Sequence, residues 1–406
     1  MKKTKFYQLI ALVIVTILCH LFACKSDTNV PKTEMTALLN RPESIQYGKE
    51  WETVQNQYQD CVLKISKNPN DNEAKLQLAQ IFTKEARVGG EHGHYYPAVL
   101  KILDEVIADE KVNKDLLFLA LVNKAGAQLS QHDFKGALVT GNEALKLNNV
   151  NAQIYGVLVD AHVELGNYEE AVKMSDKMIS IKPDIRSYSR VAYLREIYGD
   201  VNGSIEAMKL AASAGYPGTE ETSWAMLTLG NLLNEYNRKE EAIQVYSEIL
   251  SMRPDYPFAL HALGQVYQQT EKLDSAEFYF KKSISIIPEV GFYISLAELY
   301  KSQNKTEEVS KLNLEIVEML KGDVESGHNM NLEYASFYLD LMNEPNEALK
   351  YANEEYKLRP ENIDVNRLLA KINVALDMKA EARNFATAAG RTSSKNPELI
   401  SIIAKL

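Results

Sequence analysis

The chain has 406 residues and a formal net charge of −10 at neutral pH, with 46% hydrophobic and 25% charged residues. This acidic balance disfavours general affinity for nucleic acid or anionic lipid surfaces, because both are negatively charged. The three cysteines are Cys19, Cys24 and Cys61, and the first two belong to an apolar leader. Cys61 is therefore alone in the part expected to fold, which excludes an internal disulfide and a cysteine-based metal site there.

The first 23 residues have the pattern of an export signal. Three lysines (Lys2, Lys3 and Lys5) precede an apolar run of 11 residues, 9–19. A membrane-spanning helix needs about 20 apolar residues, so the run is short for a span. An uncleaved signal anchor is the alternative interpretation.

The signal ends at Leu21-Phe22-Ala23-Cys24, which resembles the lipobox of bacterial lipoproteins. The resemblance implies cleavage before Cys24 and a covalent lipid on its thiol, with no other cofactor. The junction LFACKSD is also similar to those of Bacteroidetes lipoproteins. We therefore expect a cell-envelope protein, in the outer membrane, with the periplasmic or surface face left open. Residues 24–42 are polar, contain Pro31 and Pro42, and are expected to form a flexible tether.

Small residues recur at the start of each expected second helix, at intervals of 33–39 residues. Another mostly small residue lies twelve positions before each of them. Two antiparallel helices joined by a tight turn approach closely only where both side chains are small. The eight pairs are Ala125 with Ala137, Val159 with Ala171, Ala192 with Ser204, Gly230 with Ala242, Gly264 with Ala276, Ala297 with Val309, Ser336 with Ala348, and Ala370 with Ala382.

The stretch from Leu229-Gly230 to Pro254, with Ala242 and Tyr246, resembles the tetratricopeptide repeat almost position by position. We therefore predict an all-α superhelical solenoid of antiparallel helix pairs. About nine repeats are expected over 70–395, with a capping helix at 43–69 and another at 396–406. The resemblance implies protein binding rather than catalysis.

The first repeat departs from the pattern, because its small residues Ala79 and Ala98 are 19 positions apart. An insertion of about seven residues in its turn is expected. That loop contains Glu91, His92 and His94, which are residue types that bind divalent metals. Three interpretations stay open: an irregular structural turn, a loop that contacts a partner, and a metal site.

In the tetratricopeptide family, first helices line a concave groove. Aromatic and amide side chains there suit an extended peptide, because amides satisfy its backbone groups. For Trp224 the alternative is inward packing at a repeat junction. The positions that the resemblance carries over to the two best-matching repeats are Trp224, Leu227, Asn231, Asn234, Glu235, Phe258, His261, Gln265, Gln268 and Gln269.

No Gly-rich phosphate loop, nucleophile elbow or HExxH helix is present in the sequence. The leading hypothesis is a non-catalytic, membrane-anchored scaffold that binds an envelope protein. Two alternatives are a metal-dependent maturation factor using the Glu91–His94 loop, and a SusD-like lipoprotein that captures glycans or nutrients.

Overall fold

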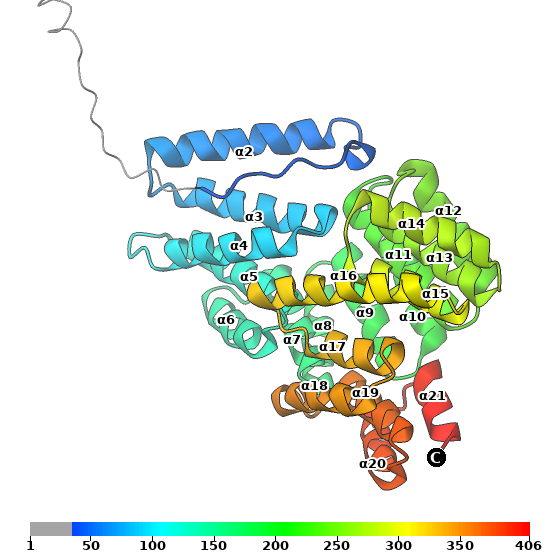
Figure 1. Cartoon of the computed structure of the whole chain (residues 1–406). Coiled ribbons are helices and arrows are strands. Elements are labelled where there is room, and N and C mark those ends of the chain that lie inside the picture. Colours follow the sequence, from blue (N-terminus) through cyan, green and yellow to red (C-terminus); the bar gives the residue numbers. More distant parts are fainter. Residues whose placement is uncertain (1–34) are drawn as a thin grey trace, which may run out of the picture. The chain divides into compact units, whose positions relative to one another are not determined.

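The computed structural model describes residues 35–406, and every regular element in that range is helical (Figure 1). The expected signal and Cys24 lie outside the described residues. None of the helices in residues 35–406 is long and apolar enough to cross a membrane. The prediction of an all-α solenoid of helix pairs is confirmed.

Nine helix pairs follow one another from Asn72 to Ala389. The short helix η1 (Glu43–Ile45) and the long helix α2 (Glu50–Lys67) precede them, and α21 (Pro397–Ala404) follows them. The first helices are α3 (Asn72–Gly89), α5 (Lys114–Ser130), α7 (Ala152–Glu164), α9 (Ile185–Ile197), α11 (Glu220–Glu235), α13 (Pro257–Gln269), α15 (Val290–Ser302), α17 (Asn331–Ser336) continued by the π-helical η2 (Phe337–Leu341), and α19 (Ile363–Ala375). The second helices are α4 (His92–Ile107), α6 (Phe134–Leu147), α8 (Tyr168–Ile181), α10 (Val201–Ser213), α12 (Lys239–Met252), α14 (Leu273–Ile286), α16 (Thr306–Glu325), α18 (Pro345–Leu358) and α20 (Lys379–Ala389).

The recurring small residues lie where the two helices of a pair touch. Ala242 and Ala276 are fully buried on their second helices. A Cβ added to Gly264 would come within 2.6 Å of the Phe280 ring, and one added to Gly230 would overlap the ring of Tyr246. The small residue on the first helix therefore makes room for an aromatic ring one turn beyond the small residue of the second helix.

The turns inside the pairs share one backbone geometry. Eight of the nine have three residues, and the middle residue has a positive φ between +57° and +78°. Six of these middle residues are not glycine, and their side chains tolerate the left-handed region at some cost. They are His132, Asn237, Glu271, Asn304, Asn343 and Asp377.

Glycine occupies that middle position only at Gly166 and Gly199. A Cβ on Gly166 would overlap the carbonyl group of Glu361, and one on Gly199 would overlap the carbonyl oxygen of Ser393. These two turns therefore require glycine because a distant part of the chain packs directly on their backbone.

That close packing joins two arms, which we call the N-terminal arm (residues 38–213) and the C-terminal arm (residues 220–406). Residues of the N-terminal arm form hydrogen bonds with residues of the C-terminal arm that lie 195–203 positions further along the chain. Tyr168 Oη accepts a hydrogen bond from the Ile363 backbone at 2.9 Å, and the Ile363 side chain packs with Val159 and Leu194. The superhelix therefore closes on itself, and the arms lie side by side (Figure 1).

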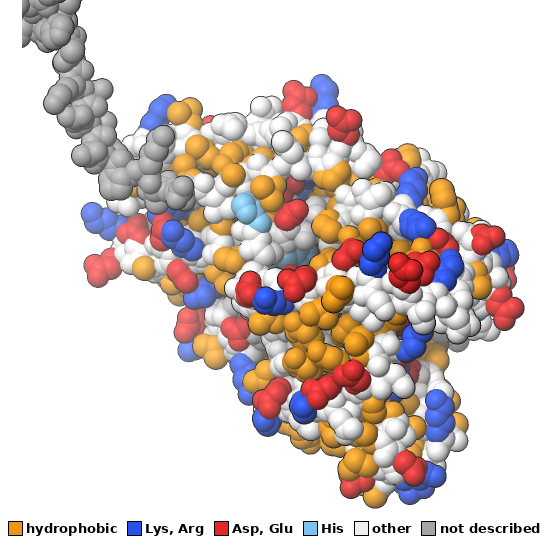
Figure 2. All heavy atoms as spheres, in the orientation of Figure 1, with side chains coloured by type: hydrophobic (Ala, Val, Ile, Leu, Met, Phe, Trp, Pro, Cys, Tyr) orange, Lys and Arg blue, Asp and Glu red, His pale blue; other side chains and the backbone are white. Residues whose placement is uncertain are grey.

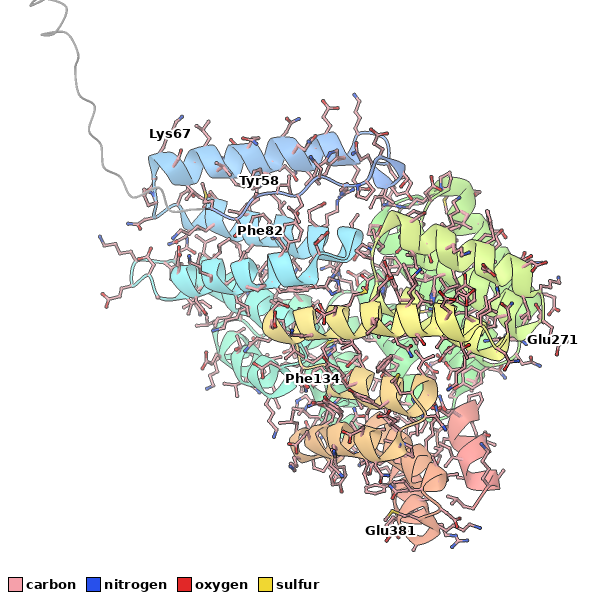
Figure 3. The ribbon with its side chains drawn as sticks, in the orientation of Figure 1. Tyr58, Lys67, Phe82, Phe134, Glu271 and Glu381 are labelled. Carbon is pink, nitrogen blue, oxygen red and sulfur yellow. The ribbon has the colours of Figure 1, made fainter. Side chains whose placement is uncertain are left out.

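The start of the described chain also belongs to this packing. Arg41 is 4% exposed and pairs with Glu85 at 2.7 Å, and Glu50 at the start of α2 contacts Arg253 at 3.3 Å. Figure 3 shows Tyr58 of α2 over Phe82 of α3, with ring centroids 6.1 Å apart. Residues 38–42 were expected to be part of a flexible tether, and that expectation is wrong, because an ion pair and a backbone hydrogen bond hold them to α3 and α4.

Candidate partner-binding surfaces

Trp224 and Leu227 lie on α11 and face different surroundings. The side chain of Trp224 is 49% exposed, whereas Leu227 is 9% exposed and belongs to the core shared by α9 to α13. The prediction that both residues face a partner is therefore wrong for Leu227. Trp224 is presented to solvent rather than packed at a repeat junction.

The polar residues at the end of α11 already have partners within the chain. Asn231 Oδ1 accepts a hydrogen bond from the Tyr246 hydroxyl at 2.8 Å. Glu235 Oε1 accepts one from Asn396 Nδ2 at 2.7 Å, next to the C-terminal helix α21. Both side chains are nevertheless exposed in part, and Asn234 is half-buried. Asn231 and Glu235 thus each form a hydrogen bond within the chain and still expose part of the side chain to solvent.

On α13, the aromatic residue Phe258 packs inward. Its ring lies 5.5 Å from Tyr256 and 5.7 Å from Phe292. His261 lies 4.6 Å from Phe292 and forms a hydrogen bond with Ser295 Oγ at 2.9 Å. Burial lowers the pKa of His261 to about 4, so the imidazole is neutral near pH 7. Of the two aromatic residues predicted to contact a partner, Trp224 and Phe258, only Trp224 is therefore available to do so.

The amides of α13 stay available. Gln265 and Gln268 are half-buried, and Gln269 at the end of the helix is exposed. The structure thus leaves Trp224 and these three glutamines as the parts of the predicted groove least engaged by the protein itself.

The Glu91–His94 segment is not an inserted loop. Helix α3 continues to Gly89 and α4 begins at His92, so only Gly90 and Glu91 connect them. The extra residues lengthen the two helices instead, which corrects the expected insertion in the turn. His94 makes an edge contact with Tyr95, at 4.8 Å between ring centroids.

His92 instead contributes to the contact between the arms. Its ring stacks on His328 at 6.0 Å, and its Nε2 lies 3.9 Å from Glu289 Oε1. Burial lowers the pKa of His92 to about 4, and nearby His328 lowers it further. Within residues 35–406 no group of three or more His, Cys, Asp or Glu side chains is arranged to hold a metal ion. The segment that raised the metal hypothesis thus packs against the C-terminal arm.

A cavity of about 340 Å³ lies between the arms. Leu129, His132 and Phe134 line it from the N-terminal arm, and Glu333 and Arg359 line it from the C-terminal arm. The guanidinium of Arg359 lies 4.6 Å from the Phe134 ring, which Figure 3 labels near α17. Five of the ten residues that line the cavity are charged, namely Glu164, Glu333, Glu355, Arg359 and Asp364.

Sequence reasoning missed the two buried arginines that hold the arms together. Arg359 pairs with Glu355 and with Glu164 across the arms, and Arg253 is 1% exposed beside Glu50 and Glu220. Each immediately precedes the proline that follows a second helix. The repeated Arg-Pro pair was the available signal, because the repeat itself needs no arginine there.

Comparison with known proteins identifies the repeats. A family model described as tetratricopeptide repeat matches residues 152–185 and 259–290. Small glutamine-rich tetratricopeptide repeat-containing protein 2 of Saccharomyces cerevisiae is 34% identical over 88 residues, which are 21% of this chain and 25% of that protein. The Protein SGT1 homolog of Oryza sativa subsp. japonica is 34% identical over 76 residues, or 19% of this chain and 20% of that protein. The matches thus span about a quarter or less of these relatives.

Among solved structures, a monomeric IFIT1 mutant with Gppp-AAAA aligns with a TM-score of 0.50 and 14% identity, covering 83% of this chain and 76% of that one. At this identity the likeness concerns the fold alone. The chain carries tetratricopeptide repeats, and such repeats generally serve as protein-interaction scaffolds.

Proposed function

We propose that this chain is a non-catalytic scaffold that binds a protein partner and is held by a lipid at the bacterial cell envelope, in the outer membrane. The observation that carries the scaffold role is the half-exposed Trp224, followed along the same repeats by the amides Gln265, Gln268 and Gln269. A large aromatic side chain left in solvent on a binding fold is the residue type that dominates protein interfaces.

Partner capture tests the scaffold role. The protein would be tagged, cross-linked in cells, and its captured proteins compared between the wild type and Trp224→Ala combined with Gln265→Ala. We expect the double variant to lose a specific captured protein, because truncating an aromatic anchor costs at least about 2 kcal/mol of binding. Tyr216→Ala is the matched control, since Tyr216 is 84% exposed on a different segment. Equal capture by both variants and the wild type would exclude this surface.

The envelope location rests on the lipobox-like junction at Cys24. Cys24→Ala is expected to abolish labelling by a fatty-acid probe and to leave the precursor uncleaved. The result that would overturn the lipid anchor is unchanged labelling of the variant. Protease accessibility on intact cells then distinguishes the periplasmic face of the outer membrane from the surface face.

A further inference from the structure

Negative charge is concentrated in one stretch of the chain. Residues 306–351 contain ten Asp and Glu but only three Lys, a formal charge of −7 within a chain whose total is −10. This stretch forms α16, α17, η2 and the first half of α18. Without the expected signal (residues 1–23, three Lys and no Asp or Glu) the chain carries −13, so this stretch supplies more than half of its negative charge and the field around it is distinctly negative.

Three tyrosines stack in the same region. The ring of Tyr351 on α18 lies 4.7 Å from Tyr334 and 5.6 Å from Tyr338, with interplanar angles of 13° and 10°. All three side chains are half-buried. Tyr334 and Tyr338 pack on the core between α15, α16 and η2, where Phe337 and Ile316 are buried. Tyr351 packs on the adjoining core that contains Ala335 and Leu339. Such stacked rings form a rigid apolar surface with little side-chain entropy left to lose on binding.

Two exposed apolar side chains lie on elements of the same region. Leu314 on α16 is 71% exposed and Met342 at the end of η2 is 36% exposed. Asn313 Nδ2 donates a hydrogen bond to Met342 Sδ at 3.2 Å, which places the two segments side by side. Figure 2 shows apolar side chains gathered between α16 and α17, with acidic side chains at the border. We call the set Leu314, Tyr334, Tyr338, Met342 and Tyr351 the tyrosine face.

The carboxylates at the border act on the tyrosines. Burial and the neighbouring Tyr351 raise the pKa of Tyr338, and Glu344 and Glu347 raise it further. Lys350 pairs with Glu347 at 2.6 Å, but no ion pair within residues 35–406 involves Glu318 or Glu344. The border therefore keeps uncompensated negative charge beside an exposed apolar surface.

We propose that the tyrosine face docks a segment of a partner protein that carries apolar side chains flanked by Lys or Arg. The apolar residues of that segment would cover Leu314 and the stacked rings, and its cations would meet the bordering carboxylates. A second copy of this chain does not fit, because a symmetric contact would place the same carboxylates opposite one another. An anionic membrane surface is excluded for the same reason.

This inference rests on the proposed scaffold function and adds a second site to it. The tyrosine face lies on α16, α17, η2 and α18, whereas Trp224 and Gln265 lie on α11 and α13. One partner protein, or two, would therefore contact the molecule at separate places.

The test measures binding of short synthetic peptides to the full chain in detergent by fluorescence anisotropy. The probes are a peptide alternating Leu and Lys, one with Ser in place of Leu, and one with Glu in place of Lys. We expect saturable binding of the Leu–Lys peptide alone, weakened by added salt. Leu314→Ser, Tyr351→Ser, and Glu318→Gln combined with Glu344→Gln should each raise the Kd about tenfold or more.

Matched controls distinguish peptide binding at the tyrosine face from attraction of the peptide to the acidic protein as a whole. Glu240→Gln combined with Glu271→Gln removes the same charge from exposed positions elsewhere, and Tyr216→Ser removes an exposed tyrosine elsewhere. These controls should bind like the wild type. Because Leu314 is mostly exposed, its variant should fold normally, and a thermal unfolding scan confirms this.

Three results would overturn the proposal. The first is equal binding by the tyrosine-face variants and the controls, and the second is equal binding of the Glu-containing peptide. The third is a concentration-dependent dimer that Leu314→Ser abolishes, because the occupant would then be a second copy. Loss of cellular partner capture in the Trp224 and Gln265 variant, with normal capture and peptide binding in the tyrosine-face variants, would refute this inference while leaving the scaffold function intact.

Discussion

The turn at Gly166 and the turn at Glu271 occupy the same place in their repeats and share a positive φ, at 78° and 59°. Gly166 lies under the backbone of Glu361 in the contact between the arms, whereas Glu271 is exposed at the rim of the molecule (Figure 3). The repeat gives both turns the same backbone conformation. At Gly166, however, the distant segment around Glu361 leaves no room for a side chain. A turn in this protein is therefore constrained in two ways: the repeat sets its backbone conformation, and contacts between the arms limit the size of its side chain.

The largest effect is expected from Arg359→Met in the contact between the arms. Arg359 is 5% exposed and its partner Glu355 is 1% exposed, so the substitution leaves a buried carboxylate without its cation. The free energy of unfolding should fall by about 3–5 kcal/mol in a denaturant titration. Arg238→Met breaks the exposed pair with Glu241 at 2.6 Å and should cost far less, because water screens that pair. Adding Glu355→Gln to Arg359→Met should recover part of the loss, and no recovery would contradict the explanation.

A somewhat smaller effect is expected from Gly166→Ala. The methyl group adds left-handed strain of about 1–2 kcal/mol and overlap with Glu361 of about 1–3 kcal/mol. Gly218→Ala is the control, because Gly218 has a φ of +74° and its nearest neighbour would lie 4.0 Å away. The free energies of unfolding of both variants isolate the contribution of the arm contact. Equal losses would show that the arms do not constrain this turn.

A third comparison concerns pH, and it uses His261 in the aromatic cluster of α13. Burial lowers its pKa to about 4 in the folded protein, whereas an unperturbed histidine has a pKa of 6.5. The unfolded chain therefore takes up the proton first, so the stabilisation is complete above pH 6.5 and is lost as pH falls from 6.5 to 4. The loss should reach about 1–3 kcal/mol. Relative to His261→Gln, the stability advantage of the wild type should shrink across this window; a constant difference would exclude a neutral buried imidazole.

The smallest effect on stability is expected at Trp224. Trp224→Ala should change the free energy of unfolding by no more than about 0.5 kcal/mol, because the side chain is 49% exposed. Leu227→Ala, on the same helix but in the core, should cost about 2–5 kcal/mol. Both are measured by denaturant titration. A large loss for Trp224→Ala would assign that side chain to the core and remove it from the candidate binding surface.

Sequence periodicity predicted the fold because each repeat has a local requirement for small residues, as at Gly230 and Ala242. Trp224 is 49% exposed in the structure, and its role in partner binding stays a prediction. Sequence reasoning failed at Leu227, Phe258 and the Glu91–His94 segment, where contacts with neighbouring repeats or the other arm decide the environment. A repeat pattern reports what a helix needs from its own pair. It does not indicate contacts with a segment nearly 200 residues away in the chain.

Closure of the arms changes how the molecule can come apart. A linear stack in which each repeat touches only its neighbours can lose its terminal repeats one at a time. Here Glu50 beside the first helix is tied to Arg253, and Arg391 near the other end donates a hydrogen bond to the Gly166 carbonyl at 2.6 Å. Neither end can fray without breaking contacts in the middle of the chain. We therefore expect unfolding to be cooperative across the described repeats, and we expect the N-terminal repeats to reach their final stability only after the C-terminal ones have been synthesised.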